Sequence, residues 1–237
     1  MLLVINHLTR MQQGYICAAG LDMKTGRHIR PVLRGRMGVC NLARNGGLFD
    51  IARIIDFTSA RPFGEPPESE DHLFYPMSSK VVGDMDPGLF WKCLEQCAHP
   101  RLSARFGKEL VKKGSNSCGV DTGKGKKSLG CLSLTTCPEL FIVSRVNRPH
   151  AIRMRLSDGE FDLDLSVTDI RLYKDDHVTP NMDVIRTVGQ RMNEEFPNMI
   201  LSVGLTRPFS SVPDEPPFHW LQLNNIHFKK DPCWQLR

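Results

Sequence analysis

The cysteines are the side chains of this sequence with the broadest chemistry, since a thiolate can bind zinc, act as a nucleophile or form a disulfide. Cys93 and Cys97 are four residues apart, which places both on one face of a helix, yet no second pair of this spacing follows. Another zinc set would need distant residues that only an irregular fold could gather: Cys118, Cys131 and Cys137 with His99 or His150. Disulfides are not expected, because residues 1–7 lack the basic start and cleavage site of an export signal. We predict reduced cysteines, no metal and no cofactor.

The glycine- and lysine-rich segment 123–128 is the next candidate, because backbone amides and ammonium groups together bind phosphate. The phosphate-binding loop of NTPases requires a glycine five residues before its Gly-Lys pair, and position 118 is a cysteine. The dinucleotide-binding spacing also fails, because Ser128 stands where the third glycine is required. What remains is a basic loop whose lysines either contact phosphate or are simply solvated.

Hydrolase chemistry has no recognisable motif in this sequence. Neither a G-x-S-x-G nor an H-E-x-x-H pattern is present. Asp162 and Asp164 share one face of a predicted strand and could hold a cation, but cross-strand ion pairs with Arg153 and Arg155 are the favoured interpretation. We assign no catalytic residue.

The C-terminal segment 218–228 interleaves aromatic, amide and imidazole side chains with aliphatic ones. Strand alternation gives one face of His219, Leu221, Leu223, Asn225 and His227 and another of Trp220, Gln222, Asn224, Ile226 and Phe228. An exposed tryptophan can stack on a nucleobase, and amides can read base edges. The alternative is that Trp220 and Trp234 fill the core.

Length and composition are those of an ordinary globular chain. The 237 residues are 41% hydrophobic and 24% charged. No apolar run approaches the roughly 18 residues that a membrane helix needs, so we expect a soluble, cytoplasmic protein. The net charge of +5 is uneven: residues 101–155 hold 12 Lys and Arg against 3 Asp and Glu, while residues 156–237 hold 8 against 13. The basic middle of the chain could form a surface that binds the phosphates of a nucleic acid, and it could equally be a solvated loop.

Hydrophobic periodicity predicts a mainly β chain with some α-helix, an α+β fold. The predicted strands cover residues 1–7, 14–22, 27–33, 48–58, 140–146, 152–156, 161–165, 199–205 and 219–228. Helices are predicted at 86–98, at 101–112 and from Pro180 to Phe196, the first capped by Asp86. The pair Asp158-Gly159 predicts a tight primed turn. Segment 61–72, with three prolines and four acids, is predicted as an exposed connection, and 112–130 as a mobile basic loop.

Short strands with one helix between them are typical of small barrels. We therefore predict a first β-barrel module at 1–80, a helical and basic-loop insertion at 81–137, and a second β-barrel module at 138–237.

Several short motifs along the chain are shared with one known family. They are Ala19–Asp22 with Gly26, Arg30–Val32, Ser128–Gly130, Gly204–Phe209, His219–Gln222 and Asn224–His227. On these motifs the sequence resembles the dual OB-containing domain family of bacterial proteins. The resemblance implies two small OB-type barrels and a role in nucleic-acid transactions, including bacterial defence systems. It transfers no catalytic or binding residue.

We expect a non-catalytic module that binds nucleic acid, DNA or RNA, through a positive surface and aromatic platforms. The residues expected at that surface are Arg27, Arg30, Arg34, Arg36, Lys124, Lys126, Lys127, Arg153, Arg155, Arg207 and Trp220. Arg30 and Arg207, each followed by proline, could instead be anchors that pair with buried carboxylates. One alternative is an adaptor that docks on a larger ATPase or nuclease, which an exposed apolar patch would favour. Another is an enzyme with an unfamiliar Cys and His site.

Overall fold

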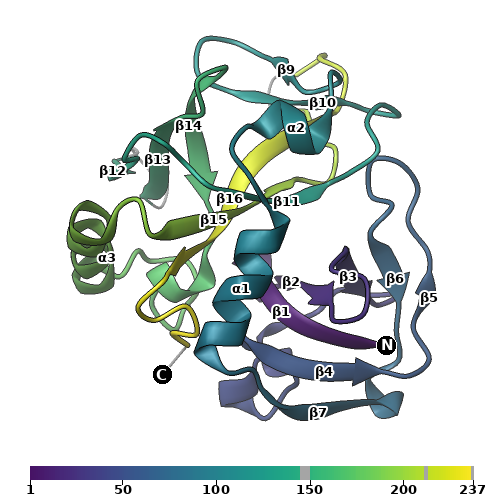
Figure 1. Ribbon diagram of the computed structural model, residues 1–237. Coiled ribbons are helices and arrows are strands. Elements are labelled where there is room, and N and C mark those ends of the chain that lie inside the picture. The colour runs from purple at the N-terminus through teal and green to yellow at the C-terminus, as the bar shows by residue number, and fades with distance from the viewer. Residues whose placement is uncertain (145–149, 211–212, 236–237) are drawn as a thin grey trace.

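The structure, a computed structural model, describes residues 1–144, 150–210 and 213–235. In these ranges the chain forms two curled β-sheets, and helix α1 (Pro87–Cys97) runs along the junction between them (Figure 1). The predicted mainly β fold is confirmed. None of the helices in the described ranges is long and apolar enough to cross a membrane.

The first sheet is built from the N-terminal part of the chain, in the order β5-β6-β3-β2-β1-β4-β7. Its strands are β1 (Leu2–Arg10), β2 (Ile16–Asp22), β3 (His28–Val32), β4 (Arg53–Phe57), β5 (Arg61–Pro62), β6 (Asp71–Leu73) and β7 (Ser79–Asp84). Strand β1 lies between β2 and β4 in this sheet, and its residues from Leu3 to Thr9 are all buried. Its register against β2 shifts between Ile5 and His7, so Asn6 is the extra residue of a β-bulge.

The second sheet has the order β12-β13-β14-β16-β15-β11-β8, and β10 pairs with both β16 and β9. Its strands are β8 (Ala98–His99), β9 (Val111–Lys112), β10 (Cys118–Asp121), β11 (Leu129–Leu132), β12 (Glu139–Val143), β13 (Ala151–Ser157), β14 (Asp162–Val167), β15 (Met199–Leu205) and β16 (Phe218–Phe228). Helices α2 (Leu102–Phe106) and α3 (Met182–Glu195) pack on this half. The long strand β16 therefore organises the second sheet, since β10, β14 and β15 all pair with it.

The helices begin where the sequence places their caps. The Asp86 carboxylate accepts a hydrogen bond from the Leu89 amide at 3.0 Å and starts α1, with Pro87 in the first turn. Asn181 caps α3 in the same way. The buried face of α1, which includes Phe90 and Leu94, packs in the core of the first sheet. Both long helices were thus correctly predicted.

The acidic segment 61–72 differs from the prediction of an exposed connection. It contains β5 and β6, and its acids Glu70 and Asp71 are buried. Arginines distant in sequence pair with these carboxylates and offset part of the cost of taking their charges out of water.

The predicted basic loop at 112–130 is interrupted by short strands. Strands β9, β10 and β11 fall in or against this range, and only residues 122–128 connect β10 to β11. These strands of two to four residues are too short to show an alternating pattern. The segment 81–137, predicted as an insertion, thus supplies α1 to the first core and strands to the second sheet.

The hairpin between β13 and β14 is confirmed, but its turn is not the tight primed turn predicted. Ser157 pairs with Asp162, which leaves four residues in the loop. The buried Asp158 carboxylate accepts hydrogen bonds from the amides of Glu160 and Phe161 and from Leu102 at the start of α2. This side chain therefore sets the turn and caps a helix at once.

Candidate nucleic-acid interface

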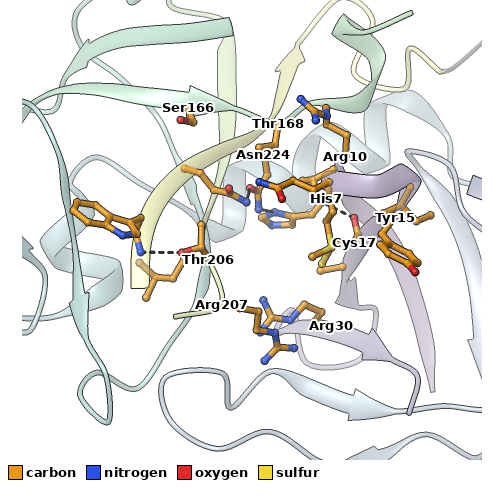
Figure 2. A pocket seen from close by; sticks show the side chains of 18 of the residues that line it. His7, Arg10, Tyr15, Cys17, Arg30, Ser166, Thr168, Thr206, Arg207 and Asn224 are labelled. Atoms are coloured by element: carbon orange, nitrogen blue, oxygen red, sulfur yellow. Dashed lines mark hydrogen bonds between the residues drawn. The ribbon is translucent and has the colours of Figure 1, made fainter. Parts of the chain in front are cut away.

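A cleft of about 1430 Å³ lies between the two sheets. Strands β1, β2 and β3 line one side of it, and β13, β14 and β16 line the other. Its floor includes His7 and Asn224, which face one another in Figure 2 with 3.0 Å between His7 Nδ1 and the Asn224 amide nitrogen. The cleft is therefore a shared surface of both halves of the chain.

Two arginines in this cleft are held by buried carboxylates. The Arg30 Nε atom lies 2.5 Å from Asp71 Oδ1, and both side chains are at most 5% exposed. Arg207 bonds the other oxygen of Asp71 and also lies 2.9 Å from Glu68 Oε2. Burial lowers the pKa of Arg207, but attraction to Asp71 and Glu68 outweighs it and raises the pKa above its ordinary value. Arg30 and Arg207 lie side by side (Figure 2). Their ion pairs with Asp71 are the contacts expected if the two arginines are structural anchors paired with a buried carboxylate.

Two other arginines of the cleft have no acidic partner within the ranges that the structure describes. The Arg36 guanidinium lies 5.0 Å from the centre of the Tyr15 ring and is exposed. The Arg10 guanidinium lies 4.6 Å from the Tyr173 ring, and its Nε atom is buried without a hydrogen-bond partner in the described ranges. Cation–π contacts of this kind orient a guanidinium without neutralising its charge. Arg10 and Arg36 thus bring to the cleft positive charge that no acid in the described ranges neutralises.

An aromatic group forms the second-sheet side of the cleft. The Trp220 backbone amide donates to Thr206 Oγ1 at 3.0 Å, and its ring nitrogen donates to the Phe209 carbonyl at 3.3 Å. The Phe218 ring packs edge-on against Trp220 with 4.8 Å between centroids. Trp220 remains partly exposed in the cleft, whereas Trp234 packs on the second core. Trp220 is therefore placed where it could stack on a nucleobase, whereas Trp234 packs against the core.

A row of amides continues this side along β16. Gln222 Nε2 donates to Asn224 Oδ1 at 3.1 Å, and both side chains line the cleft together with Trp220. The predicted alternation places Trp220, Gln222 and Asn224 on one face of β16, which is correct. It also places Ile226 and Phe228 on that face, which is wrong. A register shift against β15 makes Asn224 the extra residue of a bulge, so Ile226 and Phe228 join the core side with Leu223.

The bulge directs Asn225 at the first sheet. Its Oδ1 atom accepts from the Leu8 amide at 2.7 Å, and its Nδ2 atom donates to the Leu8 carbonyl at 3.1 Å. His227 lies with its Nε2 atom 3.1 Å from the Asn6 carbonyl. These contacts tie β16 to β1 across the junction.

The structure brings five of the eleven predicted surface residues to the cleft: Arg30, Arg36, Arg153, Arg207 and Trp220. The other six lie outside its lining: Arg27, Arg34, Lys124, Lys126, Lys127 and Arg155. Arg155 pairs with Asp164 at 3.2 Å and with Glu139 at 2.7 Å, which confirms the cross-strand ion pair expected for Asp164.

Sequence reasoning missed Arg10 and Tyr15. They flank the short connection between β1 and β2, with Arg10 ending the first strand and Tyr15 preceding the second. A basic and an aromatic residue on either side of one hairpin connection is the signal that could have indicated them, because both then emerge at the same end of the sheet.

Two curled, mainly antiparallel sheets with a cleft between them define a two-barrel β protein of the OB type. The dual OB-containing domain model matches residues 1–226, and the chain belongs to that family. The resemblance based on short motifs is thereby confirmed. Searches of curated proteins and of solved structures gave no significant match.

Proposed function

We propose that this protein binds single-stranded nucleic acid, DNA or RNA, in the cleft between its two sheets, without catalysis. The observation that carries the proposal is the placement of Arg10 and Arg36 in one cleft with Trp220 and the amides of Gln222 and Asn224. Guanidinium groups suit phosphates, an exposed indole suits a stacked base, and amides suit base edges. OB-type barrels commonly bind oligonucleotides in this manner, which supports the same assignment.

The charges of the cleft set how strongly salt should weaken this binding. The lining holds Arg10, Arg30, Arg36, Arg153 and Arg207 against Glu65, Glu68, Asp71 and Asp164. Since Arg30 and Arg207 are already paired with acids, the cleft neutralises about two to three phosphates in this scheme. The logarithm of the affinity should then fall with the logarithm of the salt concentration with a slope of about −1.4 to −2.1 for a single strand.

Fluorescence anisotropy with labelled single- and double-stranded DNA and RNA across a salt series tests the proposal. The double variant Arg10→Ala/Arg36→Ala should weaken binding and flatten the salt slope. The matched variant, Lys124→Ala/Lys126→Ala/Lys127→Ala, removes charge from a loop outside the cleft lining and should change affinity less. Equal or greater loss in the lysine variant would move the site to the loop. No binding below about 100 μM at low salt, weaker than ordinary non-specific association, would refute the function.

A second function is favoured by an apolar patch at the edge of the first sheet. Met77 is 99% exposed, and Tyr75, Val81 and Val82 beside it are exposed as well. Val81 and Val82 belong to β7, the last strand of the sheet, whose outer edge could pair with a strand of another protein. This supports the adaptor alternative, and the place in bacterial defence stays a prediction of the resemblance.

The adaptor alternative is tested by comparing the full chain with the variant Val82→Lys as baits in the native host. A partner retained by the full chain and lost from the variant, with oligonucleotide affinity unchanged in both, would support docking at β7. Identical partners for both baits would exclude it.

A further inference from the structure

We propose that a zinc ion binds at the junction of the two sheets, held by His7, His28 and Cys131 with Cys97 as the fourth ligand. The proposal concerns a site beneath the cleft and does not rest on nucleic-acid binding. Sequence reasoning noticed Cys97 and Cys131 separately, but no spacing rule connects them to two histidines from the first sheet.

The geometry of three ligands is already close to that of a metal site. One ligand atom from each of His7, His28 and Cys131 lies within 4.8 Å of the other two. The His28 Nε2 and Cys131 Sγ atoms are 3.7 Å apart. In a tetrahedral zinc site with Zn–N of about 2.0 Å and Zn–S of about 2.3 Å, that separation is about 3.5 Å. All three side chains are buried, so nothing but protein surrounds the point between them.

Cys97 can complete the set from the last residue of α1. Its thiol currently donates to the Leu94 carbonyl at 3.3 Å. Its contact with the Cys131 thiol, together with burial, raises the pKa of Cys97. A rotation of the Cys97 side chain toward Cys131 gives two sulfur and two nitrogen ligands, the composition of closed structural zinc sites.

The polar atoms around this point have unmet hydrogen-bonding capacity. In the described ranges, His7 Nε2, Asn6 Oδ1 and His227 Nδ1 are buried and have no partner. Buried polar atoms without partners cost free energy, so their clustering calls for an explanation. A metal on His7 Nε2 satisfies the first of them.

The protonation states also suit a metal. Burial lowers the pKa of His7 to about 4 and that of His28 well below its ordinary value, so both imidazoles are neutral at pH 7. The contact with Cys97, opposed by burial and aided by His7, lowers the pKa of Cys131. Neutral imidazole and thiolate are the forms that bind zinc.

Arg105 lies against the set, and metal binding would have to move it. Its Nη2 atom lies 3.4 Å from His28 Nδ1 and 3.5 Å from Glu70 Oε1. Zinc on His28 Nε2 leaves the proton on Nδ1, so Arg105 turns to Glu70. Two thiolates balance the charge of the ion, and the Arg105–Glu70 pair stays neutral as a unit.

The ion would cross-link the two halves of the fold. His7 and His28 come from β1 and β3 of the first sheet, Cys131 from β11 of the second, and Cys97 from the end of α1. With four protein ligands and no open coordination position, the site is structural rather than catalytic.

Metal analysis of the full chain, purified from cells grown with added zinc, tests the site. We expect about one zinc per chain. Cobalt exchanged into the protein should give the visible bands of tetrahedral cobalt together with near-ultraviolet thiolate-to-cobalt charge transfer. The variants Cys131→Ser and His28→Asn should lose the metal. The control Cys118→Ser, which alters a buried thiol of the second core, should keep it.

The wild-type cobalt spectrum decides the question even where a ligand variant fails to fold. A folded wild-type protein that retains neither zinc nor cobalt above background after reconstitution would overturn the proposal. Cobalt bound without thiolate charge transfer would overturn it as well, because Cys131 would not be a ligand. Oligonucleotide binding measured on the same samples reports separately on the cleft.

Discussion

Replacing Asp71 by Asn isolates the charge that holds two arginines of the cleft. Asn has nearly the same shape, so the change removes the negative charge and leaves the packing. Arg207 keeps Glu68 as a partner, 2.9 Å away. Arg30 has no other acid partner in the described part of the chain, and its side chain is only 5% exposed. The substitution therefore leaves a buried, unpaired guanidinium.

The magnitude follows from that burial. Breaking a buried ion pair by removing one partner typically costs about 3–5 kcal/mol, out of a total stability of about 5–15 kcal/mol. With a urea dependence of about 3 kcal/mol per molar, the unfolding midpoint should fall by about 1–1.7 M. Exposed pairs behave differently. Asp164→Asn, whose partner Arg155 is 58% exposed, should cost no more than about 1 kcal/mol.

Urea unfolding followed by far-ultraviolet circular dichroism measures both variants against the wild type. The double variant Arg30→Met/Asp71→Asn should recover part of the loss, because it no longer buries an unpaired charge. A single variant Asp71→Asn within about 1 kcal/mol of the wild type would show that Arg30 is not dependent on this carboxylate. Equal losses for Asp71→Asn and Asp164→Asn would refute the reasoning from burial.

Three further predictions concern the cleft, the junction and α1. Trp220→Ala should weaken single-strand binding by about 1–3 kcal/mol, a 5- to 150-fold loss in anisotropy titrations, whereas Trp234→Phe should leave affinity unchanged. Burial lowers the pKa of His227 to about 3, so the folded state keeps this ring neutral while the unfolded chain protonates it near pH 6.5. The contribution of His227 to the free energy of unfolding should thus be complete above pH 6.5 and fall toward pH 3, with about 2 kcal/mol lost by pH 5. Urea unfolding at pH 7 and pH 5 should show a smaller difference for His227→Gln than for the wild type. Asp86→Ala removes the cap of α1 and should cost about 1 kcal/mol, and a thermal midpoint equal to that of the wild type would contradict the capping role.

The elements that the sequence predicted are those with local signals. Alternation indicated β13 and β14, and capping residues indicated α1 and α3, because these patterns are written within a few neighbouring residues. The buried acids of 61–72 had no local signal. Glu70 and Asp71 are buried because Arg105, Arg30 and Arg207 come to them from elsewhere in the chain.

The candidate site was predictable to a similar extent. The chemistry of β16 was recognised in Trp220, Gln222 and Asn224, but a one-residue bulge changed the faces that followed. The basic middle of the chain drew attention to Lys124, Lys126 and Lys127, whereas the cleft is lined by Arg10 from β1 and Arg36 from the segment that follows β3. Charge density along a sequence does not show where in the fold a cation lies, nor which cations already have acidic partners, as Arg30 and Arg207 do.

The amide of Asn225 imitates a neighbouring strand for Leu8, since it both accepts from and donates to that residue's backbone. If the chain were cut between the two sheets, Leu8 and Asn225 would lie on separate fragments. The backbone amide and carbonyl of Leu8 would then lose their hydrogen-bond partners. Each fragment would then carry a ready-made recognition element for the other. Fragments of residues 1–97 and 98–237 should for this reason reassemble when produced together, which makes the junction a natural point for building a split reporter.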